Sequence, residues 1–96
     1  MPEFIGGTAA LMKYLSSNIK YPTISQETGS QGKVIVQFVV DKDGTISNPE
    51  VVRGVDPYLD KEAIRVISFM PKWTPGVQNG KKVRVKFTVP VSFRLQ

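Results

Sequence analysis

Two pairs of carboxylates are the first candidates for chemistry in this 96-residue chain. Asp41 and Asp43 precede Gly44, and Asp60 and Glu62 stand two residues apart further along. Paired carboxylates can serve acid–base catalysis or bind calcium. An EF-hand loop places its glycine at position six and ends on a glutamate, whereas Gly44 is the fourth residue counted from Asp41. We therefore interpret the first pair as part of a turn and the second as a solvent-exposed helix face.

Other residue types that support catalysis or metal binding are missing. The chain contains neither cysteine nor histidine, which removes thiol nucleophiles, imidazole bases and nearly all zinc and copper sites. We expect no enzyme activity, no metal and no cofactor. The length predicts one domain over residues 1–96 with a modest core. No apolar run reaches the roughly 20 residues of a spanning helix, and the start lacks signal-peptide features, so any export signal or anchor would lie upstream.

Positive charge is concentrated near the C-terminus. The net charge is +5, all eight acidic residues occur at or before Glu62, and six lysines and arginines follow from Lys72 onward. Such a region is either a solvated strand face or a surface for an acidic partner, anionic lipid or nucleic acid. The exposed face of the last predicted strand carries no aromatic side chain that could stack on bases, so we expect no nucleic acid.

The most regular pattern in the chain extends from Val83 to Leu95. Apolar residues alternate there with polar ones, which predicts a β-strand with one buried face. Pro90 lies within it, and a proline belongs on an edge strand or at a bulge because it cannot donate to the ladder. A partner strand can pair with such an edge, and a second copy could do the same to form a homodimer. The predicted partner-binding residues are Arg84, Val85, Lys86, Phe87, Thr88, Val89, Pro90, Val91 and Ser92.

Pro90 also predicts which side of this strand faces the partner. Without a bulge, the residues of even number face the open edge, since the missing donor costs least there. The N–H groups offered to a partner would then belong to Arg84, Lys86, Thr88 and Ser92.

The first half of the chain predicts a helix, a loop and a strand. Apolar residues at helical spacing predict a helix over 8–19, which Thr8 would cap and Tyr21-Pro22 would end. The polar segment Thr23 to Gly32 is predicted to be a loop. Val34–Val40 is almost entirely apolar and rich in β-branched residues, which is typical of a central strand.

The second half begins with a hairpin, whose turn would hold Gly44 in the left-handed region. The return strand over 45–55 contains Pro49, so it also lies at an edge or carries a bulge.

Asp56-Pro57 would begin the second helix, with Lys61, Glu62 and Arg65 facing water. Its predicted core stripe consists of Leu59, Ala63, Val66, Ile67 and Met70. Trp73 would fill the core beyond this helix, and Asn79-Gly80 would form a further turn.

Together these elements predict an α+β fold in the order α-β-β-α-β. Prolines mark the second and third strands as edges, which leaves Val34–Val40 in the middle. We predict a two-layer structure with a three-stranded antiparallel sheet of order 2-1-3 and two helices on one face.

This order and these residues resemble the carboxyl-terminal domain of the TonB family of energy transducers. The resemblance covers essentially the whole chain and depends on several motifs in sequence, not on any one dipeptide. The motifs are Tyr21-Pro22, Gly32, Phe38-Val39, Asp43-Gly44, Leu59-Asp60, Glu62-Ala63, the run Met70-Pro71-Lys72-Trp73-Thr74-Pro75-Gly76, Pro90 and Phe93. Of these, the resemblance gives a structural role to Tyr21, Pro22, Gly44, Trp73, Pro75 and Gly76. Phe4 with Gly6-Gly7, and the Met70-Pro71 to Trp73 step, look like the branch with many polysaccharide and siderophore receptors.

The resemblance implies a role in transmembrane transport. Family members are anchored in the inner membrane, cross the periplasm through a Pro-rich linker, and bind the TonB box of outer-membrane TonB-dependent receptors by β-strand addition. They transmit proton-motive-force energy from the ExbB–ExbD complex, which here would act through an N-terminal region outside this sequence. Two alternatives remain open: a TolA-like periplasmic scaffold or cell-envelope interaction module, and a sensor peptidase that carries the same domain.

Overall fold

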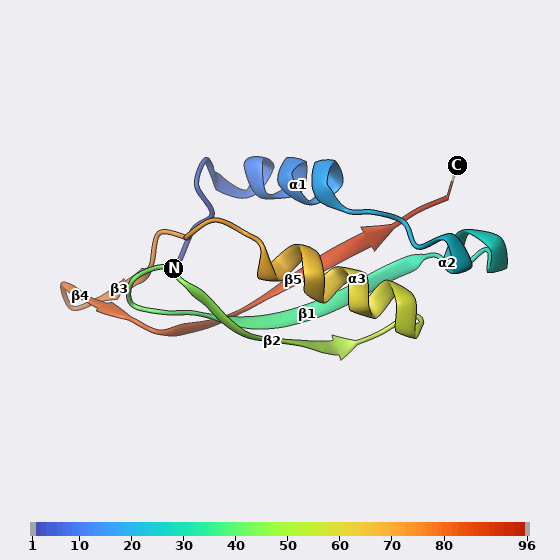
Figure 1. The fold of residues 1–96 in the computed structure, drawn as a ribbon. Helices are drawn as coiled ribbons and strands as arrows, with labels where there is room; N and C mark the ends of the chain where they lie inside the picture. The colour runs from blue at the N-terminus through green and yellow to red at the C-terminus, as the bar shows by residue number, and fades with distance from the viewer. Residues whose placement is uncertain (1, 96) are drawn as a thin grey trace.

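A three-stranded antiparallel sheet forms one layer of the protein, and helices α1 and α3 lie over the face of the sheet that carries the core (Figure 1). The structure is a computed structural model and describes residues 2–95. Its elements are α1 (Gly7–Asn18), α2 (Thr23–Thr28), β1 (Gly32–Val40), β2 (Ile46–Arg53), α3 (Pro57–Ser68), β3 (Gly76–Gln78), β4 (Lys81–Val83) and β5 (Val85–Phe93).

The central strand of the sheet is β1, and the strand order is β2-β1-β5. Alternate side chains of β1 face the helices and are completely buried, whereas the residues between them are only half-buried. The buried set consists of Val34, Val36, Phe38 and Val40. The predicted α+β class, the antiparallel sheet and the order 2-1-3 are therefore confirmed.

The two strand pairings of β1 differ in regularity. The β1–β5 register continues without a shift from Gly32 opposite Phe93 to Val40 opposite Val85. The β1–β2 register shifts twice, once between Ile35 and Val36 and once between Gln37 and Val39. The β5 edge of the sheet is thus regular in its register, whereas the β2 edge carries bulges.

An aromatic cluster closes the end of the core near the β1–β2 turn. Trp73 is only 3% exposed, and its ring centroid lies 5.3 Å from that of Phe38 and 5.1 Å from that of Phe87. The Trp73 N–H donates to the Gly44 carbonyl at 2.8 Å. A Cβ atom on Gly44 would lie 2.0 Å from the Trp73 carbonyl oxygen, so this contact requires a glycine.

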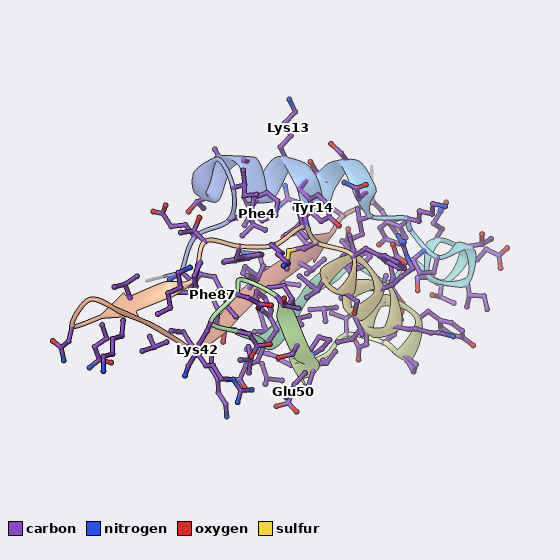
Figure 2. All side chains as sticks on the ribbon, turned by 60° about the vertical axis from the view of Figure 1, so that its left-hand side comes forward. Phe4, Lys13, Tyr14, Lys42, Glu50 and Phe87 are labelled. Atoms are coloured by element: carbon purple, nitrogen blue, oxygen red, sulfur yellow. The ribbon has the colours of Figure 1, made fainter. Side chains whose placement is uncertain are left out.

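The N-terminal segment joins the same cluster. Glu3 and Thr74 exchange two backbone hydrogen bonds of 3.0 and 2.8 Å, and the buried Phe4 ring packs edge-on against Trp73 at 5.8 Å. Phe4 also lies 5.6 Å from Tyr14 of α1, in the space between α1 and the strands (Figure 2). This segment therefore attaches α1 to the core.

Two predictions about the helices were wrong. The segment 23–32 was predicted as a loop, but its first part forms α2, which ends at Gly29 in the left-handed conformation. The reason is a tertiary contact: the fully buried Ser25 hydroxyl donates to the Asp56 carboxylate at 3.0 Å. Thr8 does not cap α1, because the chain turns through Gly6 at φ 90° and the helix begins at Gly7.

The last predicted strand, over 83–95, is in fact divided. Asn79 and Gly80 both have positive φ, 53° and 76°, as a type I′ hairpin turn requires. This turn pairs β3 with β4 in a separate two-stranded sheet. The chain leaves that hairpin at Arg84 and then enters β5, so the strand pattern extends across two different pairings.

Candidate functional site

The β5 edge carries nearly all of the residues that the sequence predicts to bind a partner strand. Residues 85–92 lie in β5, while Arg84 lies just before it, between β4 and β5. Within the described residues, β5 pairs with β1 and with no other strand, which leaves its other side open. Side chains of odd number turn toward the core, so Val89 and Val91 are buried, and those of even number are exposed.

Pro90 defines the direction of the backbone groups along this edge. It pairs with Ile35 inside the uninterrupted β1–β5 register, so the strand has no bulge there. Because the proline has no N–H to give to β1, its position is one whose backbone groups point away from β1. Backbone groups alternate sides along a strand, and those of Lys86, Thr88 and Ser92 therefore share this outward direction.

Arg84 closes the end of the β1–β5 ladder. Its Nε donates to Asp41 Oδ1 at 2.8 Å, immediately beyond the last ladder pair, Val40 opposite Val85. Both side chains are at least partly exposed, so the ion pair adds little stability. The ion pair does, however, give the Arg84 guanidinium a local counter-charge. Among the described residues, this leaves Lys86 as the unpaired cation on the exposed face of β5.

A small groove lies between the β5 edge and α1. It has a volume of about 90 Å³ and is lined by Met12, Leu15, Ser16 and Ile19 from α1 and by Pro90–Ser92 from β5. A strand added to β5 would turn every second side chain to this face of the sheet. The groove therefore offers an apolar site for a side chain of an added strand.

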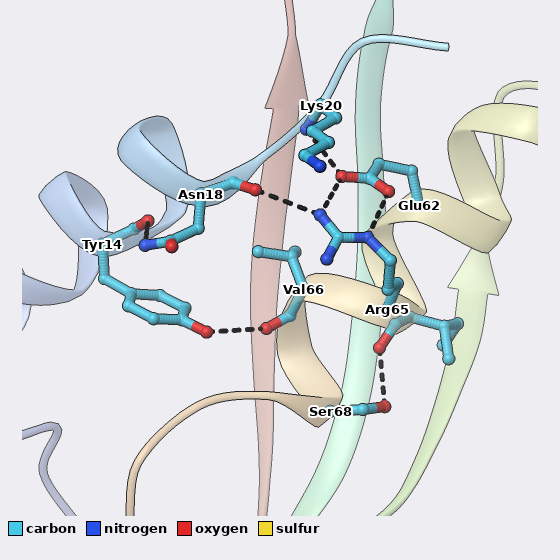
Figure 3. Close-up of polar contacts among 8 residues, drawn as sticks. Tyr14, Asn18, Lys20, Glu62, Arg65, Val66 and Ser68 are labelled. Atoms are coloured by element: carbon cyan, nitrogen blue, oxygen red, sulfur yellow. Dashed lines mark hydrogen bonds and ion pairs between the residues drawn. The ribbon is translucent and has the colours of Figure 1, made fainter.

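A polar clamp holds the C-terminal end of α1 against α3 (Figure 3). Glu62 Oε1 accepts a hydrogen bond from Arg65 Nε at 2.7 Å, and Oε2 accepts from Arg65 Nη2 at 2.7 Å and from the Lys20 N–H at 2.6 Å. Arg65 Nη2 also donates to the Asn18 carbonyl at 3.1 Å. The prediction that Glu62 faces water was wrong, since the residue is only 9% exposed. Its position opposite the end of α1 is a tertiary feature that helical periodicity does not contain.

The clamp changes the acidity of its members. Burial by itself would raise the pKa of Glu62, but the hydrogen bonds from Arg65 and from the Lys20 N–H outweigh it and hold that pKa below its ordinary value. The hydrogen bond to Glu62 raises the pKa of Arg65. Both groups are therefore charged at neutral pH, and the ion pair helps to hold the end of α1 against α3.

Comparison with known proteins identifies the family. The sequence model described as "Gram-negative bacterial TonB protein C-terminal" matches residues 17–95. The chain belongs to this family. It is also 32% identical over 91 residues to protein TonB of Haemophilus influenzae, a match that covers 91% of this chain but only 34% of that protein. The chain thus spans about a third of the length of this TonB relative.

Solved structures show that the TonB C-terminal fold is shared. The solution structure of the Helicobacter pylori TonB C-terminal domain, residues 194–285, matches with a TM-score of 0.67 and 23% identity over 90% of each chain. A longer form of that domain, residues 179–285, matches with a TM-score of 0.58 and 25% identity over 88% of this chain and 78% of that one. The likeness covers about nine-tenths of this chain and supports the fold.

The remaining residues of the TonB-like pattern lie away from the outward edge. Tyr21 packs edge-on against Phe93 at 5.6 Å and its hydroxyl donates to the Ser30 carbonyl. Pro22 is the N-cap of α2, and Pro75 precedes Gly76, where β3 begins. These residues, with Gly44 and Trp73, join elements to one another.

Each of the four candidate carboxylates has a local partner. Asp41 pairs with Arg84, and Glu62 pairs with Arg65. Asp43 accepts the Thr45 N–H at 3.0 Å, which lowers the pKa of Asp43, and Asp60 accepts the Val55 N–H at 2.9 Å.

Among residues 2–95, no group of three or more potential metal ligands is present. Nor does this part of the chain contain a helix long and apolar enough to cross a membrane.

Proposed function

We propose that this chain is the periplasmic receptor-binding part of a TonB-type energy transducer. It would bind the TonB box of an outer-membrane TonB-dependent receptor as an additional strand beside β5. Energy from the inner-membrane proton gradient would reach it from ExbB–ExbD through an N-terminal region outside this sequence. Membership of the TonB C-terminal family supports the general role.

The observation that best supports strand addition is the open edge of β5, which is regular in its register. Its ladder with β1 is uninterrupted over the length of β5, and Pro90 fits that ladder without a bulge. Apart from the donor that Pro90 lacks, the edge therefore presents regularly spaced donors and acceptors that match those of an extended peptide. The same edge could pair with a second copy of the chain, so peptide binding is best measured where sedimentation shows a monomer.

Backbone pairing alone gives little net affinity. Each hydrogen bond contributes about 0.5–1.5 kcal/mol, and ordering each peptide residue costs about 1–2 kcal/mol, so the two nearly cancel. Affinity must come from side chains and from tethering, which raises the effective concentration. A weak, reversible interaction suits a transducer that serves many receptors.

The two sides of the added strand would meet different chemistry. One side faces the apolar groove between Met12, Ile19 and Val91. The other side faces the exposed β5 side chains, where Lys86 is the free cation among the described residues. We therefore expect the best peptide to combine an apolar residue near Val91 with an acidic residue near Lys86.

An NMR titration with a synthetic TonB-box peptide tests the proposal. We expect the largest amide shifts in β5 and in the facing side of α1, with the β2 amides nearly unchanged. Thr88→Pro should abolish binding because it removes an outward donor at the centre of the edge. Thr88→Val is the matched control, since it changes the side chain, keeps the N–H and should bind normally. Largest shifts on β2, or unchanged affinity in a folded Thr88→Pro protein, would show that the site is wrong.

A further inference from the structure

A second concave surface lies between the start of α2 and the outer side of α3, and strand addition at β5 makes no use of it. It has a volume of about 390 Å³. Its lining includes the rings of Tyr21, Pro22 and Tyr58, the cations of Lys20, Lys61 and Arg65, and the Glu62 carboxylate.

Three side-chain rings form the apolar part of this surface. Tyr21 is held in place because its ring packs on Phe93 and its hydroxyl donates to the Ser30 carbonyl. Pro22 follows it directly and is half-buried. Tyr58, from the first turn of α3, is 48% exposed and lines the same surface as Tyr21 and Pro22.

The rim of the surface carries unbalanced positive charge. Arg65 is paired with Glu62, and both Glu62 oxygens are already engaged by Arg65 and the Lys20 N–H. Within residues 2–95, neither Lys20 nor Lys61 has a carboxylate within 4.0 Å. Three cations and one carboxylate therefore line this surface. This excess of positive charge favours an acidic occupant by charge complementarity.

The surface is preformed. The Glu62–Arg65 clamp holds the end of α1 to α3, and the bond from Ser25 to Asp56 holds α2 to the start of α3. Because these contacts fix the walls, binding would not have to order them first.

The backbone around this surface limits how a peptide can bind. The walls come from α3 and from residues 20–23, which link α1 to α2 and begin α2. Pro22 has no N–H, so no strand edge is available for pairing. A polyproline II segment needs no backbone ladder, and its rings dock between aromatic and proline side chains. The occupant that fits both the rings and the charge is thus an acidic segment that contains prolines.

We propose that the surface formed by Tyr21, Pro22 and Tyr58 with Lys20 and Lys61 binds an acidic, proline-containing segment of a partner protein in the polyproline II conformation. This site is separate from the outward edge of β5. Its occupancy does not depend on strand addition there.

The test uses the whole chain, labelled with nitrogen-15, and a short synthetic peptide of alternating glutamate and proline. We expect amide shifts at Lys20, Thr23, Tyr58 and Lys61. A glutamate–serine peptide of equal length and charge should bind at least about fivefold more weakly. A lysine–proline peptide should not bind. Equal affinity for the glutamate–proline and glutamate–serine peptides, or a response only to phosphatidylglycerol vesicles, would overturn the proposal.

Matched variants locate the site. Tyr58→Ala and Lys61→Glu should each weaken binding by about fivefold or more, and both residues are exposed, so the fold should persist. Lys13→Glu makes the same charge change on the outer face of α1, where Lys13 extends away from the molecule (Figure 2), and should have little effect. Thr88→Pro should leave this binding intact, which separates it from the β5 edge. Unchanged affinity in both Tyr58→Ala and Lys61→Glu would overturn the assignment.

Discussion

The two edges of the sheet, β2 and β5, each contain a proline but place it differently. Pro49 lies at a register shift where Asn48 and Pro49 together oppose Phe38, and Asn48 has a positive φ of 50°. A second shift leaves Val52 as an extra residue further along β2. Pro90, in contrast, lies in a ladder with no shift at all.

This difference shows that a proline in an edge strand can belong either to a bulge that hinders further pairing or to a regular edge that permits it. Bulges twist an edge and interrupt its donors, which is one way that proteins prevent further pairing. On β2 the proline belongs to such an interruption. On β5 the missing N–H falls on the outward side of an otherwise regular strand. The β5 edge is therefore the one suited to accept a partner strand.

The largest effect is expected where both edges depend on one core residue. Trp73 contacts Phe38 of β1 and Phe87 of β5, and its backbone bonds to the β1–β2 turn. Trp73→Ala should lower the free energy of unfolding by about 3–5 kcal/mol in a denaturant titration. Trp73→Phe should cost less, because the indole N–H has no partner within the described residues. A fully stable Trp73→Ala protein that loses peptide binding would instead assign Trp73 to the site.

The turn that leads into β2 provides the next test. Gly44 has a φ of +88° and lies against the Trp73 carbonyl, whereas Gly80, in the β3–β4 turn, has a φ of +76° and open space around it. The positive φ costs an alanine about 1–3 kcal/mol at either position, and Gly44→Ala adds a backbone clash. Thermal unfolding should therefore show a clearly larger loss for Gly44→Ala than for Gly80→Ala. Equal losses would mean that the contact between this turn and Trp73 is not close.

Much of the frame that creates these edges follows from local sequence signals. The nearly continuous apolar run Val34–Val40 marks a central strand, and Pro49 and Pro90 mark its two neighbours. Asp56-Pro57 predicts the start of α3, and there the Asp56 carboxylate accepts the Leu59 N–H at 2.7 Å. These signals are local, because each depends on dihedral limits or on the period of one element.

What the sequence does not reveal depends on contacts between distant segments. The short helix α2 depends on the bond between Ser25 and Asp56, and the burial of Glu62 depends on the end of α1. The difference between the two edges is likewise a matter of register, which the presence of a proline alone does not predict. The placement of Pro90 outward needed the additional condition that no bulge occurs, and the register satisfies it.

The Glu62–Arg65 clamp between α1 and α3 predicts a pH-dependent difference in stability. The pKa of Glu62 is lowered in the folded state from an ordinary value of 4.5. The stability that its charge contributes is therefore complete above that value and is lost as the pH falls through the folded-state pKa. Glu62→Gln should destabilise the protein by about 2 kcal/mol at neutral pH. The difference in unfolding free energy between this variant and the wild type should disappear in acid. Asp56 and Asp43 also have lowered pKa values, so the variant keeps a weaker acid dependence of its own.

The same variant should affect only one of the two edges. Glu62→Gln releases part of the hold on α1, so the groove between α1 and β5 should loosen and peptide affinity should fall. Hydrogen exchange should become faster in the last turn of α1, while exchange in β2 should change little. Equal changes in α1 and β2 would mean that the clamp stabilises the whole protein and does not position α1 in particular.

The smallest effect is expected from Arg84, because in the proposed complex the backbone of β5 makes the interaction and Arg84 is already paired with Asp41. Its side chain is 58% exposed and paired with Asp41, and such surface pairs contribute about 0–1 kcal/mol. Arg84→Ala should weaken TonB-box peptide binding by less than about threefold in calorimetry. Asp41→Asn frees the guanidinium and should slightly strengthen binding of a peptide with acidic residues, with a steeper dependence on salt. If Arg84→Ala abolished binding in a folded protein, side-chain charge rather than the open ladder would distinguish β5 from β2.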